Sequence, residues 1–195
     1  MKIGETITFG SYYQLGSKSP IEWIILAKEG NKALLVSKYI LDCKQYNTTN
    51  SKVTWETCTL RKWLNNDFLN IAFNDNEKEK IVEATVKNEN NPQHETDGGN
   101  DTKDKVFLLS FNEAYKYFED NDARTCKTTV YAISMGAYTY NSNDKYNGNG
   151  WWWLRSPGSV PSDATNVGSY GDLNLDGSSV QHTYGGIRPA LWIYL

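Results

Sequence analysis

The chain has 195 residues, a length that suits one domain with a full hydrophobic core. Its formal net charge of −3 argues against nucleic acid as a partner, and no apolar run is long enough to predict membrane insertion. Met1–Gly10 has no apolar run typical of a signal peptide, so the localisation stays open between the cell surface, secretion and display on a virion. The cysteines are odd in number and widely spaced, which predicts free thiols: Cys43, Cys58 and Cys126.

Strands dominate the first part of the predicted fold. Glu5–Gly10 alternates apolar and polar residues, the pattern of a half-buried strand that ends at a glycine. The apolar run Ile21–Ala27 follows Pro20, and Lys32–Leu41 returns after the turn Glu29–Lys32. These two runs therefore predict a β-hairpin.

A helical period replaces the strand pattern in the next part of the chain. Asn74, with Glu77 three residues later, resembles a capping box for a short second helix, and Ile81–Val86 predicts a further strand. The first helix is predicted by apolar residues at the spacing of one helical face: Leu60, Trp63, Leu64, Phe68 and Ile71.

The segment Asn88–Asp104 contains no aliphatic or aromatic residue. Apolar burial therefore cannot offset the entropy lost when such a segment is ordered, which predicts a mobile surface loop. His94 lies in it without a second ligand at metal-binding spacing, so we expect an exposed histidine and no metal.

The following predicted elements are short. Lys105–Leu109 predicts a buried strand, and Ser110 with Glu113 forms a capping box at the start of a helix. Gly136 interrupts the apolar stretch Val130–Tyr140, which predicts a bent strand or an irregular segment. Strands followed by helices, then by strands and loops, are typical of an α+β fold with antiparallel pairing.

The stretch Asp172–Gly177 is the sharpest local match to a metal-binding motif. It places oxygen-bearing side chains at the first, third and fifth positions of a calcium loop and glycine at the sixth. The twelfth position is Thr183, where a bidentate glutamate is required, and the same residues equally suit a type I′ hairpin turn. The hairpin is favoured and no cofactor is expected; calcium is the alternative, with the ligands Asp172, Asn174 and Asp176.

Aromatic and charged residues share the last apolar segments. If Trp151–Trp153 is extended, its side chains alternate between the two faces of the strand, so one indole points away from the core. That indole is either covered by a loop or free to stack on a sugar or a base. Arg155 and Arg188 lie within apolar sequence, and a buried guanidinium needs a carboxylate or several carbonyls. A structural pair is favoured over an anion site, and the candidate partners are Glu22, Asp163 and Asp172.

The sequence predicts no catalytic residue. His182, the second histidine, is accompanied by neither a Gly-x-Ser-x-Gly elbow nor a nearby cysteine. Phosphate-binding and dinucleotide-binding glycine motifs are lacking as well. We therefore expect a protein that is not an enzyme.

Two apolar motifs frame the C-terminal region: Trp-Trp-Leu-Arg-Ser-Pro-Gly at 152–158 and Gly-Ile-Arg-Pro-Ala-Leu-Trp at 186–192. With Pro-Ile-Glu-Trp at 20–23, they resemble a bacterial domain-of-unknown-function family common in gut Firmicutes. More distantly, Gly-Ile-Arg-Pro-Ala is similar to the ends of C-type-lectin-like domains of the formylglycine-generating-enzyme type, whose fold is shared by variable proteins that retroelements diversify. The resemblance implies one domain, residues 1–195, with a C-type-lectin-like α+β fold of antiparallel sheets, two main helices, long loops and paired N- and C-terminal strands.

The resemblance also implies a function. In the variable proteins the diversified positions lie between the equivalents of Trp153 and Gly186, and here that interval has the small, polar and tyrosine-rich composition of adaptable binding surfaces. Formylglycine-generating enzymes use a late cysteine pair, whereas no cysteine follows Cys126. We expect a non-enzymatic module, of the retroelement-diversified kind, that presents residues 159–184 to a protein or glycan. There are two alternatives: a formylglycine-generating-enzyme-like oxidase, and a structural adhesin or scaffold domain. The expected ligand-binding residues are Asp163, Thr165, Asn166, Ser169, Tyr170, Asp172, Asn174, His182 and Tyr184.

Overall fold

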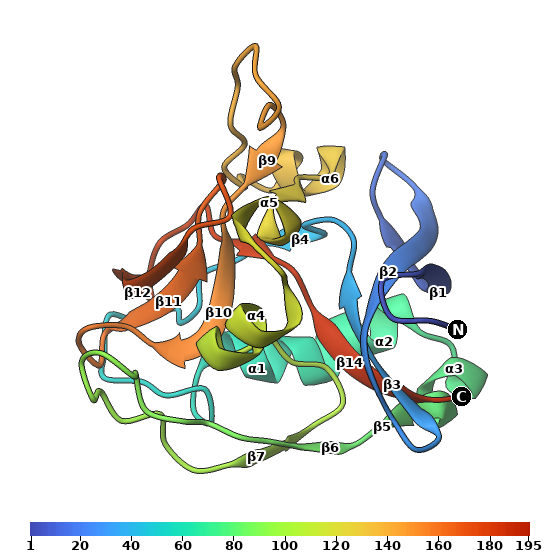
Figure 1. Cartoon of the computed structure of the whole chain (residues 1–195), viewed down its shortest axis with the longest axis horizontal. Coiled ribbons are helices and arrows are strands. Elements are labelled where there is room, and N and C mark those ends of the chain that lie inside the picture. The colour runs from blue at the N-terminus through green and yellow to red at the C-terminus, as the bar shows by residue number, and fades with distance from the viewer.

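The computed structural model describes all 195 residues and contains two five-stranded sheets with short helices around them (Figure 1). In the first sheet the order is β1 (Thr6–Tyr13), β2 (Lys18–Glu29), β3 (Lys32–Ser37), β14 (Ala190–Tyr194) and β5 (Ile81–Val82). In the second sheet the order is β12 (Leu173–Ser179), β11 (Asp163–Val167), β10 (Trp152–Pro157), β13 (Gly186–Ile187) and β4 (Asp42–Cys43). The strand pairs are antiparallel except for β10 with β13, so the fold is α+β with mostly antiparallel sheets, as predicted.

Smaller elements complete the chain. Two-stranded ladders are formed by β6 (Ala84–Val86) with β7 (Thr102–Asp104), and by β8 (Cys126–Lys127) with β9 (Asn149–Gly150). The helices are α1 (Thr59–Trp63), the π-helical turn η1 (Leu64–Phe68), α2 (Leu69–Ala72), α3 (Asp75–Lys80), α4 (Phe111–Tyr117), α5 (Asn121–Arg124) and α6 (Val130–Ser134). One hydrophobic cluster includes buried residues from both sheets and from the helices between them.

Several local predictions are confirmed. The turn between β2 and β3 places Gly30 at a φ of +56°, a region that glycine enters without steric cost. The α1–η1–α2 helix buries Leu60, Leu64 and Phe68, as the apolar spacing predicts. Ile71, predicted on the same face, follows the π-helical turn η1 and is exposed. Both capping boxes form, with the side chain of Asn74 accepting a hydrogen bond at the start of α3 and that of Ser110 at the start of α4.

The first and last strands share a sheet but do not pair with each other, so the predicted pairing of the termini is wrong. β2 and β3 lie between β1 and β14. The β2–β3 hairpin leaves the far edge of β3 free, and β14 pairs along it from Ala190, opposite Val36, to Tyr194, opposite Lys32. The two ends of the chain still lie on the same side of the molecule (Figure 1).

Two short segments differ from their predicted form. The stretch predicted to be a bent strand or an irregular segment begins with helix α6, because the side chain of Thr129 accepts a hydrogen bond from the Ala132 amide and caps it. Gly136, at a φ of +102°, follows its end. Lys105–Leu109 is largely buried as expected, but it forms only an isolated bridge, between Phe107 and Ala190, instead of a strand.

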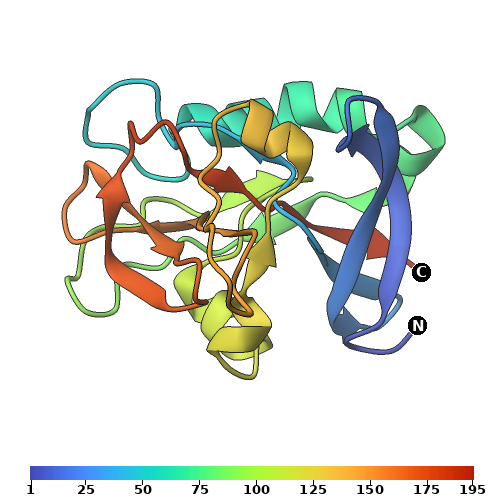
Figure 2. The same ribbon diagram turned by 90° about the horizontal axis from the view of Figure 1, so that it is seen from above.

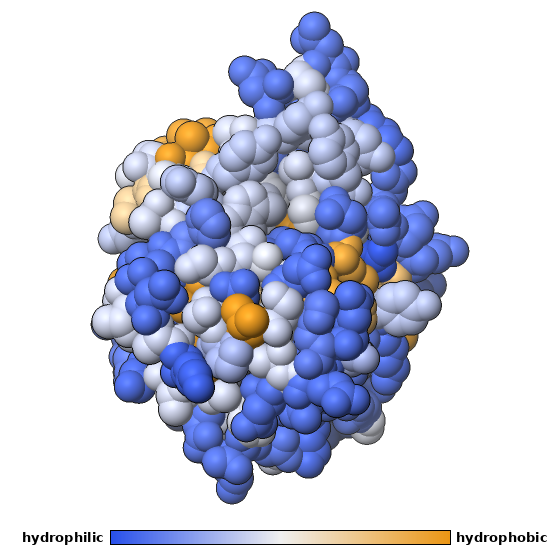
Figure 3. Space-filling view, turned by 90° about the vertical axis from the view of Figure 1, so that its left-hand side faces the viewer, coloured by the Kyte–Doolittle hydropathy of each residue, from blue (hydrophilic) through white to orange (hydrophobic).

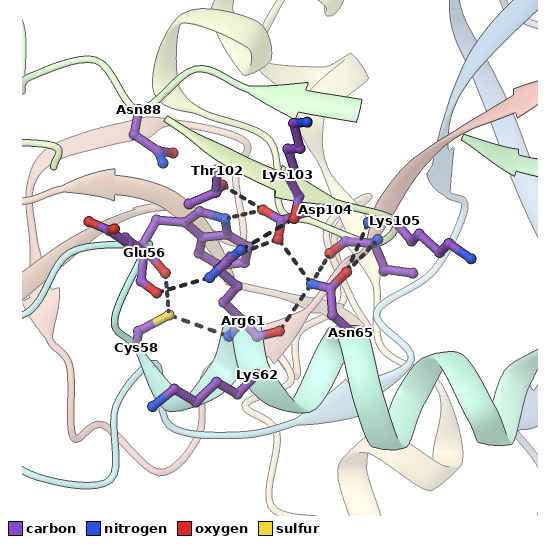
Figure 4. A network of polar contacts seen from close by, with 12 residues as sticks. Glu56, Cys58, Arg61, Lys62, Asn65, Asn88, Thr102, Lys103, Asp104 and Lys105 are labelled. Atoms are coloured by element: carbon purple, nitrogen blue, oxygen red, sulfur yellow. Dashed lines mark hydrogen bonds and ion pairs between the residues drawn. The ribbon is translucent and has the colours of Figure 1, made fainter. Parts of the chain in front are cut away.

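The segment Asn88–Asp104, predicted to be mobile, is anchored by buried polar side chains. The carboxylate of Asp104 accepts hydrogen bonds from Trp55 Nε1 at 2.9 Å, Arg61 Nε at 2.7 Å and Thr102 Oγ1 at 2.7 Å (Figure 4). Such a fully bonded group tolerates burial that an unpaired carboxylate does not. Polar partners thus replace the apolar burial that the segment lacks.

The other end of this segment is held in the same way. Asn91 is 1% exposed, and its Nδ2 donates to the carbonyls of Pro157 and Leu175, each at 2.9 Å. His94, predicted to be an exposed histidine, has a partner: its Nε2 lies 2.7 Å from Asp176 Oδ1. The segment therefore crosses from the α1 side to the β10 and β12 strands as an ordered part of the fold.

The guanidinium of Arg155 makes the structural pair that its buried position predicts. It contacts Glu113, which also closes the capping box of α4, and donates to the Leu108 and Lys87 carbonyls, each at 2.8 Å. The pair joins β10 to the start of α4. Its acid is therefore none of the three candidates predicted from the sequence, Glu22, Asp163 and Asp172.

Arg188 is buried without a carboxylate. It donates to the carbonyls of Ser37 and Arg124, each at 3.0 Å. Its guanidinium centre lies 4.8 Å from the ring centroid of Trp152 and 5.1 Å from that of Phe118. Burial lowers the pKa of this guanidinium, and the two carbonyls and aromatic faces are the partners that stabilise its charge in the core.

Candidate ligand-binding surface

A loop between α6 and β9 rises above the second sheet at the top of the molecule (Figure 1). We call residues Thr139–Gly148 the apical loop. Its base is closed by hydrogen bonds between Tyr140 and two residues at its far end: the Tyr140 amide donates to the Asn149 carbonyl, and the Gly148 amide donates to the Tyr140 carbonyl, each at 2.7 Å. Seen from above, α6 and the outer strands of the second sheet lie on different sides of this loop (Figure 2).

Three tyrosines pack together at the apical loop. The ring centroid of Tyr170, in the turn between β11 and β12, lies 5.1 Å from that of Tyr140 and 4.8 Å from that of Tyr146. Tyr170 remains 42% exposed. The next residue, Gly171, approaches the backbone of Asn121 so closely that a Cβ would lie 1.7 Å from the carbonyl oxygen. Only glycine therefore allows this turn to press against α5 and present Tyr170.

The groups around the Tyr170 ring disfavour ionisation of its phenol. A hydrogen bond with Tyr140, together with burial and the nearby Asp144 carboxylate, raises the pKa of Tyr170 to about 12. Hydrogen bonds from Lys145 and Tyr146 lower the pKa of Asp122. At neutral pH this part of the surface therefore offers the neutral phenol of Tyr170 beside the ionised Asp122 and the ammonium group of Lys145.

A second aromatic group lies beside the first. His182 packs with its ring centroid 6.2 Å from that of Trp151 and 5.6 Å from that of Tyr184, and Tyr184 is half exposed. A Cβ on Gly185 would lie 1.9 Å from the Trp153 indole nitrogen, so a glycine is required where the chain passes over this buried ring. This close approach fixes the backbone next to Tyr184 and thereby its position on the surface.

Tyr138 joins the two groups into one surface. Its amide donates to the Tyr184 carbonyl at 3.1 Å, and its side chain is among the groups that raise the pKa of Tyr170. Exposed apolar residues of α6 border this area, and a patch of apolar atoms is visible at the upper left of the space-filling view (Figure 3). We call the following set the apical aromatic surface: Tyr138, Tyr140, Tyr146, Trp151, Tyr170, His182 and Tyr184.

Three of the predicted ligand-binding residues are buried and cannot contact a ligand in this structure. Thr165 is fully buried and its Oγ1 donates to the Ser156 carbonyl at 3.0 Å. The Asn166 carboxamide donates to Ser178 at 3.0 Å, and Ser169 is buried as well. Small polar residues were expected on loops, but here β11 lies between β10 and β12, where such side chains bond within the sheet.

The remaining predicted residues do not form one group. Tyr170, His182 and Tyr184 belong to the apical aromatic surface. Asp163 pairs with Ser179, at the end of β11 farther from the turn that carries Tyr170. Burial raises the pKa of the Asp163 carboxyl, and His182 opposes this shift. Asp172 directly precedes β12, and Asn174 is the second residue of that strand.

The predicted hairpin at Asp176 and Gly177 is wrong, because β12 runs through both residues. Its pairing with β11 contains a register shift, and Gly177 adopts a φ of +80° there. The carboxamide of Asn174 spans this irregularity by bonding both the amide and the carbonyl of Gly177. The proposed calcium ligands Asn174 and Asp176 thus have other partners, Gly177 and His94.

Sequence reasoning missed three members of the surface, Tyr138, Tyr140 and Tyr146, and it considered Trp151 only as one of three indoles that could point away from the core. They precede the interval 159–184 on which the prediction concentrated. A usable signal was present, since three tyrosines fall within nine residues of otherwise polar, turn-forming sequence. Large aromatic side chains without apolar neighbours are typical of exposed contact surfaces.

The three cysteines are free and buried, as predicted for structural thiols. Burial raises the pKa of Cys43 to about 11 and that of Cys58 to about 12, and it also raises that of Cys126. Since the thiolate is the reactive form, these thiols are unreactive at neutral pH.

Fold and surface together define an α+β domain of mostly antiparallel strands with a loop-built aromatic face. The family model described as "Domain of unknown function (DUF6273)" matches residues 30–195, and the chain belongs to this family. The match begins in the turn between β2 and β3, so β1 and β2 precede it although they complete the first sheet. No curated protein and no solved structure matches the chain significantly. None of the helices has the length and apolar character needed to cross a membrane.

Proposed function

We propose that the protein is a non-enzymatic ligand-binding module whose apical aromatic surface contacts a protein or a glycan. The observation that carries this proposal is the convergence of aromatic side chains from separate parts of the chain. The apical loop contributes Tyr140 and Tyr146, the β11–β12 turn contributes Tyr170, and the segment before β13 contributes Tyr184. Tyrosine and tryptophan offer large contact area at a low cost in conformational entropy.

The support beneath these side chains favours binding further. The close backbone approaches at Gly171 and Gly185 hold the two chain segments in place before a ligand arrives. A preformed surface loses less conformational entropy on association than a loose one. The unreactive, buried thiols support the non-enzymatic assignment, and we expect no aldehyde when the protein is incubated with copper and a cysteine-containing peptide.

The resemblance to C-type-lectin-like variable proteins agrees with a binding role for this end of the molecule. In that interpretation Tyr170, His182 and Tyr184 tolerate diversification, whereas the buried Thr165 and Asn166 do not. A reverse-transcriptase gene beside a near-copy of the region that encodes residues 151–195 would support retroelement diversification. Sequence variation at Thr165 as frequent as at Tyr184 would contradict this placement of the surface.

The direct test replaces Tyr170 and Tyr184 by alanine, singly and together. The wild-type protein is screened against arrays of defined glycans and purified extracellular proteins, and the affinity of each hit is measured by biolayer interferometry. Because central tyrosines in interfaces often contribute about 2 kcal/mol or more, we expect the double variant to lose at least roughly 100-fold in affinity. Unfolding temperatures should change little, since both side chains are substantially exposed.

Tyr115 is the matched control. It lies on α4, away from the surface, and is 70% exposed. Tyr115→Ala removes the same side chain and should leave the affinity at the wild-type value. Wild-type affinity in the Tyr170→Ala, Tyr184→Ala double variant would contradict the proposed site.

A further inference from the structure

A separate pocket of about 370 Å³ opens between α1 and the segment that follows β4. Leu60 and Trp63 form its apolar wall on the α1 side, and Lys44, Gln45 and Thr183 contribute polar groups. Its size lies near the lower end of ligand pockets, roughly 300–1,000 Å³, and suits one small ring better than an extended chain. It contains none of the residues of the apical aromatic surface.

The ammonium group of Lys44 lies in this pocket without an acidic partner. It lies 4.6 Å from the ring centroid of Trp63 and forms no ion pair or hydrogen bond with another protein group. The nearest candidate acid in sequence, Asp42, is engaged elsewhere, because its oxygens accept hydrogen bonds from Tyr12 Oη and the Cys43 amide, each at 2.6 Å. A carboxylate entering the pocket would be a stronger partner for this ammonium than the indole face alone.

Further polar groups at the pocket have unused hydrogen-bonding capacity. The hydroxyls of Thr48 and Thr183 line it and make no hydrogen bond to protein. Gln45 donates through Nε2 to the Gln181 carbonyl at 2.8 Å, which leaves its Oε1 available. Hydroxyls and an amide oxygen at the rim of a partly aromatic pocket match the alternating donors and acceptors of a sugar ring.

We propose that this pocket binds a single carboxylated sugar unit, such as a uronic acid. Lys44, above the indole of Trp63, holds the carboxylate. Gln45 and the threonine hydroxyls bond the ring hydroxyls, and the apolar part of the ring contacts the indole beside the ammonium group. The inference goes beyond the proposed function and does not rest on it, since different residues form the two sites. A protein with both sites would contact a large partner at the apical aromatic surface and an acidic sugar beside α1.

A second polar pocket, on the other side of α1, carries no such inference. It is lined by Lys62, Lys103 and Lys105, but their ammonium groups point in different directions, away from one another (Figure 4). One of its two acids, Asp104, is already occupied by the structural network, and the other is Glu83. Lys62 is therefore a useful control, because it lies next to Trp63 on the same helix and lines the second pocket but not the first.

The test compares D-glucuronate with D-glucose, which differ at one carbon, a carboxylate against a hydroxymethyl group. Saturation-transfer NMR detects weak binding, and titration followed through the tryptophan indole signals in ¹H–¹⁵N spectra gives affinities and location. We expect glucuronate to bind at millimolar concentration and to shift the Trp63 indole signal, with glucose at least about tenfold weaker, the effect of one charge-assisted contact.

Variants locate the charge that is responsible. Lys44→Gln should reduce glucuronate affinity about tenfold, to that of glucose, while leaving glucose affinity unchanged. Lys62→Gln makes the same charge change and should retain wild-type affinity, and thermal melts confirm that both variants fold. Equal affinities for the two sugars, no binding of glucuronate, or an equal loss in Lys44→Gln and Lys62→Gln would each overturn the proposal. None of these results alters the outcome of the Tyr170 and Tyr184 experiment, so the two proposals fail separately.

Discussion

The segments Asn88–Asp104 and Thr139–Gly148 are both polar and rich in turn-forming residues, yet they occupy opposite situations in the structure. The first is held by buried side chains that bond to distant parts of the fold, such as Asn91 with the Leu175 carbonyl. The second, the apical loop, is exposed and closed mainly by bonds among its own residues, such as Ser142 with Asp144. Composition alone therefore does not distinguish an anchored segment from a protruding one; the number of buried polar partners does.

Substitution of one aspartate in each segment should give the largest difference in the free energy of unfolding. Asp104→Ala removes the acceptor of Trp55 and Arg61 in a buried site, and breaking such a pair typically costs about 3–5 kcal/mol. Chemical denaturation should report a loss in the free energy of unfolding of this order. Asp144→Ala, in the exposed apical loop, should leave the unfolding temperature unchanged. Similar losses in the two variants would remove the distinction between the segments.

An intermediate effect is expected from Asn91→Ala. The change leaves the carbonyls of Pro157 and Leu175 without their donor, which typically costs about 1–3 kcal/mol. Hydrogen exchange should accelerate across residues 88–101 and remain slow in the buried strand β10. If stability fell while exchange in the segment stayed unchanged, Asn91 would not be its anchor.

The smallest effect is expected from Asn147→Ala, the matched change in the apical loop. Asn147 is exposed, and its carboxamide oxygen accepts one bond, from the Ser142 amide at 3.2 Å. Surface substitutions of this kind usually change stability by no more than about 0.5 kcal/mol. Faster exchange confined to residues 141–148, measured by the same method, would sharpen the comparison, whereas global destabilisation would show that the loop supports the fold.

The two segments also explain which parts of the fold were predictable. Capping boxes at Asn74 and Ser110 join residues three positions apart, so the sequence displays the whole interaction. The β2–β3 hairpin is similarly local. In contrast, the predicted mobility of Asn88–Asp104 counted only apolar burial and missed its polar anchors, whose partners lie elsewhere in the chain.

The candidate surface was predictable only in part, because local composition is visible in the sequence and contacts between distant segments are not. The polar and tyrosine-rich interval before Gly186 includes Tyr170 and Tyr184, and the structure leaves both side chains exposed. Thr165 and Asn166 share that composition but lie in a strand between two others, and no local pattern reveals this position. Tyr140 and Tyr146 join Tyr170 only because the apical loop lies against the β11–β12 turn.

The sequence by itself determined the α+β character, the helical face that begins at Leu60, the helix caps and the burial of Arg155, because these depend on periodicity or on neighbours within one turn. Only the tertiary structure decided that β14 pairs with β3, that Glu113 is the partner of Arg155, and that separate segments form one aromatic surface. These contacts join residues tens of positions apart. Their partners are selected when the chain packs into one core, because a buried charge or hydrogen-bonding group is stable only where that packing supplies a complement.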